Sequence, residues 1–357
     1  MSREPGWGLK ALLGVAAAVV VIAGLRASGP LILPILVAGF LAILSLPVLQ
    51  WLRQRGLPIS LSVVLTVVVV GAVLGIFGLL VNAAVAEARS AAPAYLEQLR
   101  DQIVQAQETL RQSSLADYFA PERLDPAALA ETINSILGGV IRGTVVGVAT
   151  VLSYITLIFL ALIFMLAEAC IFQEKMTVAS TRESWIAMEQ VRQIALEVQH
   201  YLGIKTAVSL ATGTVIFLWT WLAGLDFPLF WGLSAFVLNY IPTLGSILAG
   251  APAVVLALVQ QGVGLAGVVA LGYLVTNIGL GNLLEPRLMG IRFRLSTLVV
   301  FLSLLFWGFV WGPLGMLLSV PLTRSLLIVL EHSGNFDWLI VLLGRRPKAA
   351  PGPEGVA

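Results

Sequence analysis

Apolar residues along this chain form long, nearly uncharged blocks that are separated by two polar stretches. The first three blocks cover about Leu9–Leu25, Leu31–Trp51 and Leu61–Ala86. About 20 apolar residues in α-helix are needed to cross the hydrocarbon core of a bilayer. The pattern therefore predicts a transmembrane helix over each of these ranges, although the first block is short.

Three more apolar blocks, Gly143–Ala167, Thr206–Leu225 and Leu265–Leu284, predict further spans. The polar stretches, Glu87–Arg142 and Gln173–His200, carry apolar residues at steps of three and four, which is typical of amphipathic helices outside the membrane. The first stretch is interpreted as a helical loop packed on the spans, with an oligomer contact as the alternative.

Two apolar runs do not fit a single regular span. Leu229–Leu258 is interrupted at Asn239–Gly245, and Ser296–Leu330 is interrupted at Trp311–Gly315. An unpaired backbone group is costly in hydrocarbon, so a break persists only where it faces protein or a wet cavity. Both runs are therefore predicted to be broken helices, either as re-entrant hairpins, which the charge pattern below favours, or as segments that cross the membrane.

Composition supports this class, because 59% of the residues are hydrophobic and only 11% are charged. Soluble domains have roughly 25% charged residues. The sequence predicts an all-α polytopic membrane protein with about six to eight membrane segments. No basic stripe with interleaved aromatics indicates nucleic-acid binding. No phosphate loop, catalytic constellation or metal-ligand spacing is found, so neither an enzyme nor a cofactor is expected.

Positive charge near the spans predicts the topology, because cytoplasmic loops carry the excess of Lys and Arg. The Arg53–Arg55 loop is placed inside, and hairpins at both breaks also return Arg287 and the C-terminal arginines to the inside. Both termini are thus expected in the cytoplasm, with the protein in the plasma membrane. The predicted regions are the N-terminal spans (1–86), an extracytoplasmic segment (87–142), a span (143–170), a cytoplasmic amphipathic helix (171–205), a transport core (206–343) and a disordered tail (344–357).

The two breaks resemble each other, since Pro242-Thr243-Leu244-Gly245 and Pro313-Leu314-Gly315 are each followed by an aliphatic pair and a proline. A span followed by a broken hairpin would then occur twice, which is the layout of an inverted-repeat transporter with its site where the broken elements meet. Chance similarity is the alternative, because Gly and Pro are frequent in membrane helices.

Uncharged polar residues near the breaks are the candidate binding residues, because unwound backbone and amide or hydroxyl side chains offer hydrogen bonds. The candidates are Asn239, Pro242, Thr243, Gly245 and Ser246 at the first break, Asn277 and Asn282 on the following span, and Pro313 and Gly315 at the second break. Taken as an α-helix, that span does not place Asn277 and Asn282 strictly on one face. Alternatively, these side chains only satisfy the freed backbone.

Glu285 and Arg287 are the candidates for ion coupling or gating, because charged residues near membrane depth are expensive and usually functional. The alternative is a local ion pair at the cytoplasmic interface, which contributes little to stability. Two interpretations of Glu285 are therefore kept: it is a gate or a proton-binding carboxylate, or it is part of a purely structural ion pair.

Three motifs resemble the autoinducer-2 exporter family of permeases. They are Trp231-Gly232-Leu233-Ser234-Ala235-Phe236-Val237-Leu238-Asn239-Tyr240-Ile241-Pro242-Thr243-Leu244-Gly245-Ser246, Asn282-Leu283-Leu284-Glu285-Pro286-Arg287-Leu288-Met289-Gly290 and Gly312-Pro313-Leu314-Gly315-Met316-Leu317-Leu318-Ser319-Val320-Pro321-Leu322. The similarity covers nearly the whole chain but is specific only from about Tyr201 onward. The sequence departs from the residues common in that family at Thr243 and at Arg294-Leu295-Ser296-Thr297. These differences bear on the substrate more than on the fold.

The resemblance implies a secondary transporter, in a family with both exporters of a small signalling molecule and sodium–proton antiporters. The charge-poor spans favour export of a small polar solute, driven by an ion gradient, with the bilayer and the solute or a cation as partners. The alternatives are a cation–proton antiporter and a non-transporting scaffold, which would have no reason to break its helices in the membrane.

Overall fold

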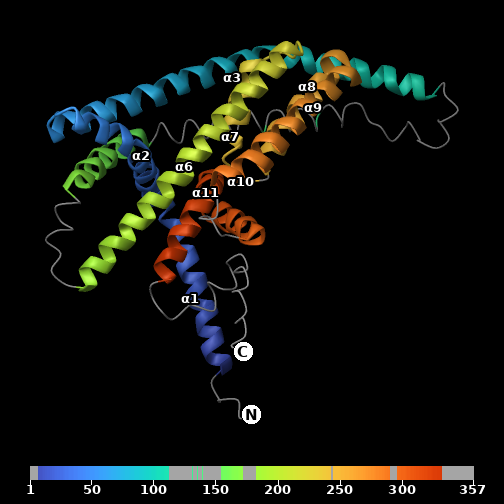
Figure 1. The fold of residues 1–357 in the computed structure, drawn as a ribbon. Coiled ribbons are helices and arrows are strands. Elements are labelled where there is room, and N and C mark those ends of the chain that lie inside the picture. Colours follow the sequence, from blue (N-terminus) through green and yellow to red (C-terminus); the bar gives the residue numbers. More distant parts are fainter. Residues whose placement is uncertain are drawn as a thin grey trace, which may run out of the picture. The chain divides into compact units, whose positions relative to one another are not determined.

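The computed structural model describes residues 7–111, 131, 135, 139, 154–171, 182–242, 244–289 and 296–331, and these residues are almost entirely helical, with no strand among them (Figure 1). The helices are α1 (Trp7–Ala27), α2 (Gly29–Gln54), α3 (Ile59–Arg111), Tyr154–Ile171, α6 (Arg182–Leu222), α7 (Pro228–Leu238), α8 (Leu244–Gln261), α9 (Val263–Thr276), the π-helix η2 (Asn277–Leu284), α10 (Glu285–Met289) and α11 (Thr297–Glu331).

Seven of the described helical segments are long and apolar enough to cross a membrane: Gly29–Gln54, Ile59–Ala91, Tyr154–Ile171, Met188–Leu222, Leu244–Gln261, Val263–Met289 and Leu298–Leu330. Large apolar side chains such as Val73, Phe164 and Leu222 are exposed on their outer faces. Exposed apolar surface on this scale marks a surface that contacts something other than water, here the lipid tails. The all-α polytopic membrane fold predicted from the sequence is confirmed.

Two of the helices are longer than the spans predicted within them. α3 continues from its apolar part without interruption to Arg111, and α6 joins a polar stretch to an apolar one in a single helix. The polar parts are rich in Ala, Glu, Gln, Leu and Arg, which favour helix, so nothing stops the helix where the polarity changes. Of the other predicted spans, residues 143–153 lie outside the described part of the chain.

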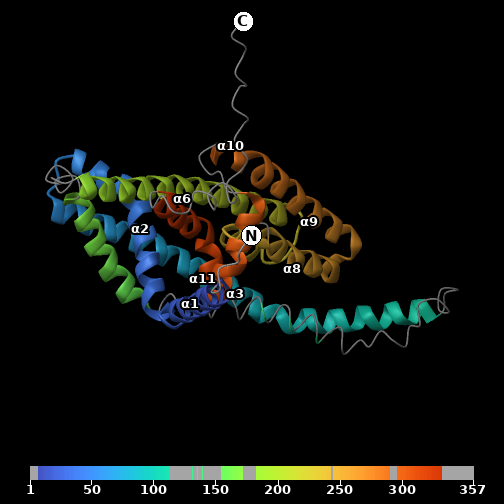
Figure 2. The same cartoon turned by 90° about the horizontal axis from the view of Figure 1, so that it is seen from below.

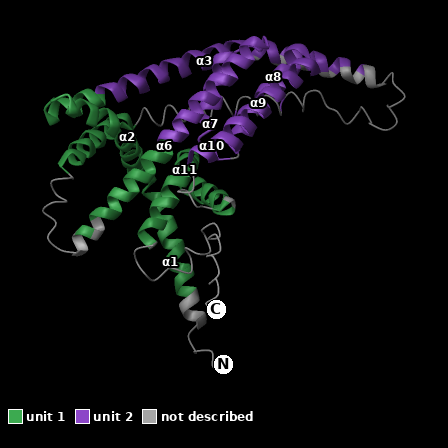
Figure 3. Ribbon diagram, in the orientation of Figure 1, with its two compact units in different colours: residues 1–67, 154–202, 291–357 green, residues 68–153, 203–290 purple. Residues whose placement is uncertain are grey.

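The chain divides into two compact units, which are described separately (Figure 3). Unit 1 comprises 1–67, 154–202 and 291–357, and unit 2 comprises 68–153 and 203–290. Two of the four boundaries, 67/68 and 202/203, fall inside α3 and α6. Each predicted break lies in a different unit: the first joins α7 to α8 in unit 2, and the second lies within α11 in unit 1.

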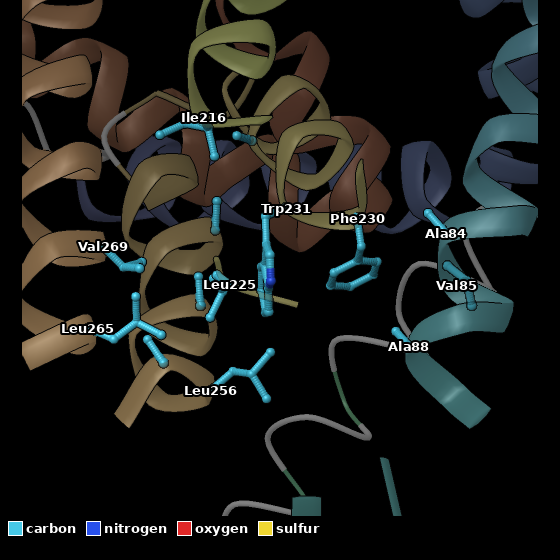
Figure 4. Packing of buried hydrophobic residues seen from close by; sticks show 14 of the residues in the cluster. Ala84, Val85, Ala88, Ile216, Leu225, Phe230, Trp231, Leu256, Leu265 and Val269 are labelled. Atoms are coloured by element: carbon cyan, nitrogen blue, oxygen red, sulfur yellow. The ribbon is translucent and has the colours of Figure 1, made fainter. Parts of the chain in front are cut away.

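The core of unit 2 is built on α7, α8 and α9 with parts of α3 and α6. In Figure 4 the Leu225, Leu265 and Val269 side chains lie on one side of the indole of Trp231, and the ring of Phe230 lies on the other. α8 and α9 pack side by side along their lengths (Figures 1 and 2). Small residues in these helices, including the three buried alanines of α8, let the backbones approach closely, as membrane helices require.

α6 and α7 cross at a pair of glycines. A Cβ on Gly213 would lie 2.8 Å from the carbonyl oxygen of Gly232, and a Cβ on Gly232 would lie 2.7 Å from Cβ of Phe217. Both glycines are buried. Because the helices approach so closely, the part of α6 just before Gly213 lies beside the end of α7, where the chain breaks.

In unit 2 the turn between α6 and α7 is fastened to α3 beyond its apolar part. The hydroxyl of Tyr95 donates to Oδ2 of Asp226, and the indole N–H of Trp231 donates to the carbonyl oxygen of Asp226 at 2.9 Å. Phe227, the next residue, has a left-handed φ of 59°, which is unusual for a bulky side chain. Burial, and after it the hydrogen bond to Asp226 and the charge of that residue, raises the pKa of Tyr95 to about 12.

The Tyr95–Asp226 contact gives an expected pH dependence. An unfolded tyrosine titrates near pH 10, whereas the folded phenol keeps its proton until about pH 12. The contribution of the protonated Tyr95 hydroxyl to the free energy of unfolding is therefore fully present below about pH 10, and it is lost as the pH rises from about 10 to 12. Thermal unfolding of the wild type and Tyr95→Phe should show a constant difference from pH 7 to 9.5 that shrinks above it. A difference that grows above pH 10 would contradict the assignment.

Candidate solute-binding site

The first break is a tight turn between two helices. α7 ends at Leu238, and α8 begins at Leu244. The N–H of Ile241 donates to the carbonyl oxygen of Leu238 at 2.9 Å, and the N–H of Gly245 donates to that of Ile241 at 3.2 Å. These bonds satisfy part of the backbone that the break releases. Thr243, a predicted binding residue, lies outside the described residues.

Gly245 is required by the closeness of this turn. A Cβ at this position would overlap the carbonyl oxygen of Leu238 and lie 2.6 Å from its carbonyl carbon. Because both atoms belong to the backbone, no change of rotamer could relieve the overlap. The glycine thus allows α8 to start directly beside the end of α7.

Two side chains of the turn are held by α6. Nδ2 of Asn239 donates to Oγ of Ser209 at 2.9 Å, and the hydroxyl of Tyr240 donates to Oγ1 of Thr206 at 2.7 Å. Ser209 is fully buried. The amide of Asn239 therefore does more than pair with its own backbone: it is oriented by a neighbouring helix.

The helix α9 is followed directly by the π-helix η2, which begins at Asn277. π-Helices are rare, and they often occur at functional sites. Their hydrogen bonds join residues five apart, so Asn277 and Asn282 lie about one turn apart, closer to a common face than α-helical spacing implies. The amide oxygen of Asn277 lies 3.0 Å from where a Cβ of Gly281 would be, so this glycine leaves room for it. Asn282 itself is exposed.

A small pocket lies between these elements, entirely within unit 2. Its lining residues come from α6, α7, α8, α9 and η2, and they are Thr212, Ile216, Ala235, Asn239, Ser246, Ala249, Tyr273, Thr276, Asn277 and Gly281. Most of the surface that faces the hollow is carbon, with polar groups at a few positions, as in most ligand sites. The space open to the centre of a water-sized molecule is about 20 Å³, and roughly 10 to 15 Å³ holds one water.

Tyr273 contributes the one buried side-chain oxygen of the described residues that has no hydrogen-bond partner among them. Its ring packs on Gly250, where a Cβ would lie 3.1 Å from the ring. A buried polar group without a partner is destabilising by about 1 to 3 kcal/mol. Such groups are uncommon and call for an explanation, and Tyr273 is also one of the residues that line the pocket.

A largely buried ion pair joins α6 to α10 (Glu285–Met289). Nζ of Lys205, on α6, lies 2.7 Å from Oε1 of Glu285, and the two side chains are 5% and 16% exposed. The sequence suggested Arg287 as the partner of Glu285, but Arg287 is exposed and the bond is made to a residue 80 positions away. The fold thus brings together Lys205 and Glu285, which are far apart in the sequence.

The second break, in unit 1, repeats the tight geometry of the first. Trp311 and Gly312 have non-helical backbone angles, with φ of 65° at Gly312. A Cβ on Gly315 would overlap the carbonyl oxygen of Trp307. A hydrogen-bond network closes the hairpin, with the indole of Trp307 donating to Thr323 Oγ1 at 2.9 Å. The proline and glycine signal thus predicted both breaks.

Apart from the exposed Asn282 and from Thr243, which lies outside the described residues, the predicted binding residues separate into three groups. Asn239, Ser246 and Asn277 line the pocket of unit 2. Pro242 and Gly245 shape the turn beside it. Pro313 and Gly315 belong to the break in unit 1. A binding role for each, and a single site framed by both breaks, stay predictions.

Two residues that the structure makes prominent were not among the sequence candidates. Tyr273 resembles any aromatic residue of an apolar helix, and only its unpartnered hydroxyl distinguishes it. Lys205 had a visible signal: a lysine that leads directly into an apolar run of one helix. An ionisable residue inside a span is a functional candidate by default.

Comparison with known proteins agrees with this architecture. The AI-2E family transporter model matches residues 15–334. The chain belongs to the AI-2E transporter family. It is 36% identical over 343 residues to the AI-2 transport protein TqsA of Escherichia coli K12, covering 94% of this chain and 96% of TqsA. A Haemophilus influenzae relative, provisionally named a transport protein, is also 36% identical over 343 residues, with the same coverage.

A second relative in Escherichia coli K12, YhhT, also carries a provisional transport name and is 35% identical over 347 residues, 96% of each chain. Family membership makes this a permease-like membrane transporter. All three relatives are named as transport proteins, and of these three names that of TqsA includes a solute.

Proposed function

We propose that this AI-2E family member is a secondary transporter of the plasma membrane that exports a small polar solute, of the kind named for TqsA, driven by an ion gradient. The observation that carries the proposal is the buried hydroxyl of Tyr273, which has no hydrogen-bond partner among the described residues and belongs to a residue that lines a pocket at a helix break. Transporters place substrate sites at such breaks, where unwound backbone lines a cavity.

The lining suits a neutral, hydroxylated solute. Tyr273 supplies a hydroxyl donor, the amides of Asn239 and Asn277 supply donors and acceptors, and none of the described residues that line the pocket is charged. Several hydrogen bonds to one small molecule, made away from water, favour a solute with several oxygens. Export requires the pocket to open to each side in turn. We also propose that both termini lie in the cytoplasm, because the loops rich in Lys and Arg indicate that orientation.

One observation favours a second candidate, cation–proton exchange. The pocket as it stands has room for about one water, whereas organic ligands occupy pockets of roughly 300 Å³ or more. An organic solute therefore requires the surrounding helices to move apart, while a single dehydrated cation does not. A non-transporting scaffold is least supported, because it gives no role to a buried polar group next to a broken helix.

Inverted membrane vesicles separate these candidates. With labelled autoinducer-2 as the probe, the proposal predicts uptake into inverted vesicles that rises when a proton gradient is imposed. Sodium-driven proton movement without solute uptake would instead support the antiporter. Uptake that depends only on the solute gradient would indicate a channel, and no movement of any of these probes would leave the scaffold.

Tyr273→Phe is the variant that tests the site. Removing the hydroxyl should weaken solute binding about tenfold, because one buried hydrogen bond contributes on the order of 1.4 kcal/mol. The folded protein should not be destabilised, since the hydroxyl has no partner among the described residues. Initial rates against solute concentration in proteoliposomes give KM, and thermal unfolding in detergent gives stability.

The matched control is Tyr154→Phe, at a tyrosine of the span Tyr154–Ile171 in unit 1. Its KM should equal that of the wild type. If Tyr273→Phe leaves KM unchanged, or lowers stability by as much as it weakens transport, the hydroxyl is not part of a solute site.

A further inference from the structure

Lys205 and Glu285 belong to two helical segments that are long and apolar enough to cross a membrane, Met188–Leu222 and Val263–Met289. A buried pair is weak evidence for stability, because replacing both partners by apolar residues is often neutral or stabilising. Ionisable residues inside spans instead mark ion and substrate pathways. The pair therefore calls for a functional explanation.

Two rows of residues connect the pair to the pocket. On α6, Lys205, Ser209 and Thr212 are spaced by four and three residues, which places them on one helical face. Ser209 binds Asn239, and Thr212 lines the pocket. At 1.5 Å per residue, Lys205 lies about 10 Å along α6 from Thr212.

The second row lies on the facing segment. Asn277 and Gly281 line the pocket, and Glu285 follows at the same interval of four residues, where η2 gives way to α10. The pair thus joins the ends of two rows whose other ends reach the pocket. Between Asn277 and Glu285 the chain is a π-helix, whose irregular hydrogen bonding is typical of functional segments.

We propose that Lys205 is a coupling residue, whose ammonium holds the Glu285 carboxylate until a monovalent cation, a proton or Na⁺, takes its place. Binding of the cation at Glu285 releases Lys205 from the π-helical segment and frees the pocket wall to move. Other ionisable side chains on the packed elements are Arg287 on α10 and Tyr240, whose hydroxyl binds Thr206 next to Lys205. This inference rests on the proposed transport function.

The double variant Lys205→Met with Glu285→Gln tests it, because it removes both charges at similar volume and leaves neither buried ion unpaired. Two activities are measured in proteoliposomes with labelled autoinducer-2: exchange of labelled for unlabelled solute, and accumulation driven by a proton or a sodium gradient. Exchange should stay within about twofold of the wild type, and gradient-driven accumulation should fall about tenfold or more, the usual size of a lost coupling. The gradient that drives the wild type tells the proton from Na⁺.

The control changes a different ion pair of α6, Arg192→Gln with Glu189→Gln, whose side chains are 56% and 39% exposed. It should leave both activities as in the wild type. Equal loss of exchange and accumulation in the Lys205–Glu285 variant would show a structural role only, and full coupling would also overturn the proposal. Absence of exchange in the wild type would instead overturn the proposed transport function.

Discussion

Replacing Gly245 by alanine is expected to disrupt the α7–α8 hairpin and abolish transport. The added Cβ would overlap the carbonyl oxygen of Leu238. Overpacking usually destabilises by about 1 to 3 kcal/mol, and here we expect at least the upper end, because backbone cannot yield as a side chain does. Thermal unfolding of the purified protein, together with solute uptake in proteoliposomes, measures the effect.

Gly267→Ala is the matched control, since nothing lies within 4 Å of a Cβ at that position of α9. Alanine is a better helix former than glycine by about 1 kcal/mol, so this variant should be as stable as the wild type or slightly more. If both variants unfolded at the same temperature, the break would be looser than described, and Gly245 would not determine it.

Glu285→Ala should be the most destabilising change to a single charge. It leaves the ammonium of Lys205, which is 5% exposed, buried without its partner. Removing one member of a buried pair destabilises by about 3 to 5 kcal/mol, whereas removing both is often neutral. The midpoint of thermal unfolding should therefore fall in Glu285→Ala and recover in the double variant Lys205→Met with Glu285→Ala.

An exposed pair gives the comparison. Glu189→Ala removes the partner of Arg192 on the surface of α6, and pairs of this kind contribute about 0 to 1 kcal/mol. A fall in Glu285→Ala no larger than that in Glu189→Ala, or no recovery in the double variant, would mean that Lys205 and Glu285 do not depend on each other in the folded protein.

The membrane class and both breaks could be predicted from sequence because each follows from a local rule. Long uncharged blocks have few structures open to them other than membrane helices. Pro242 and Gly245, like Pro313 and Gly315, interrupt those blocks where a regular helix would be expected. At both places, helical geometry is lost.

The remaining features depend on contacts between distant segments, which no local pattern reports. Lys205 and Glu285 are 80 residues apart, so the nearby Arg287 was the natural partner to expect. With α-helical spacing, Asn277 and Asn282 do not share one helical face. The π-helix that contains them brings them closer to a common face. The unpartnered hydroxyl of Tyr273 exists only once the surrounding helices have packed.

We propose that solute binds in the pocket beside the first break, and a density map of the protein with bound autoinducer-2 would show whether it does. We expect density for the solute among α6, α8 and η2, within hydrogen-bonding distance of the Tyr273 hydroxyl, with the pocket wider than in the absence of solute. Solute density elsewhere on the protein, with Tyr273 still unpartnered and the pocket unchanged, would contradict it.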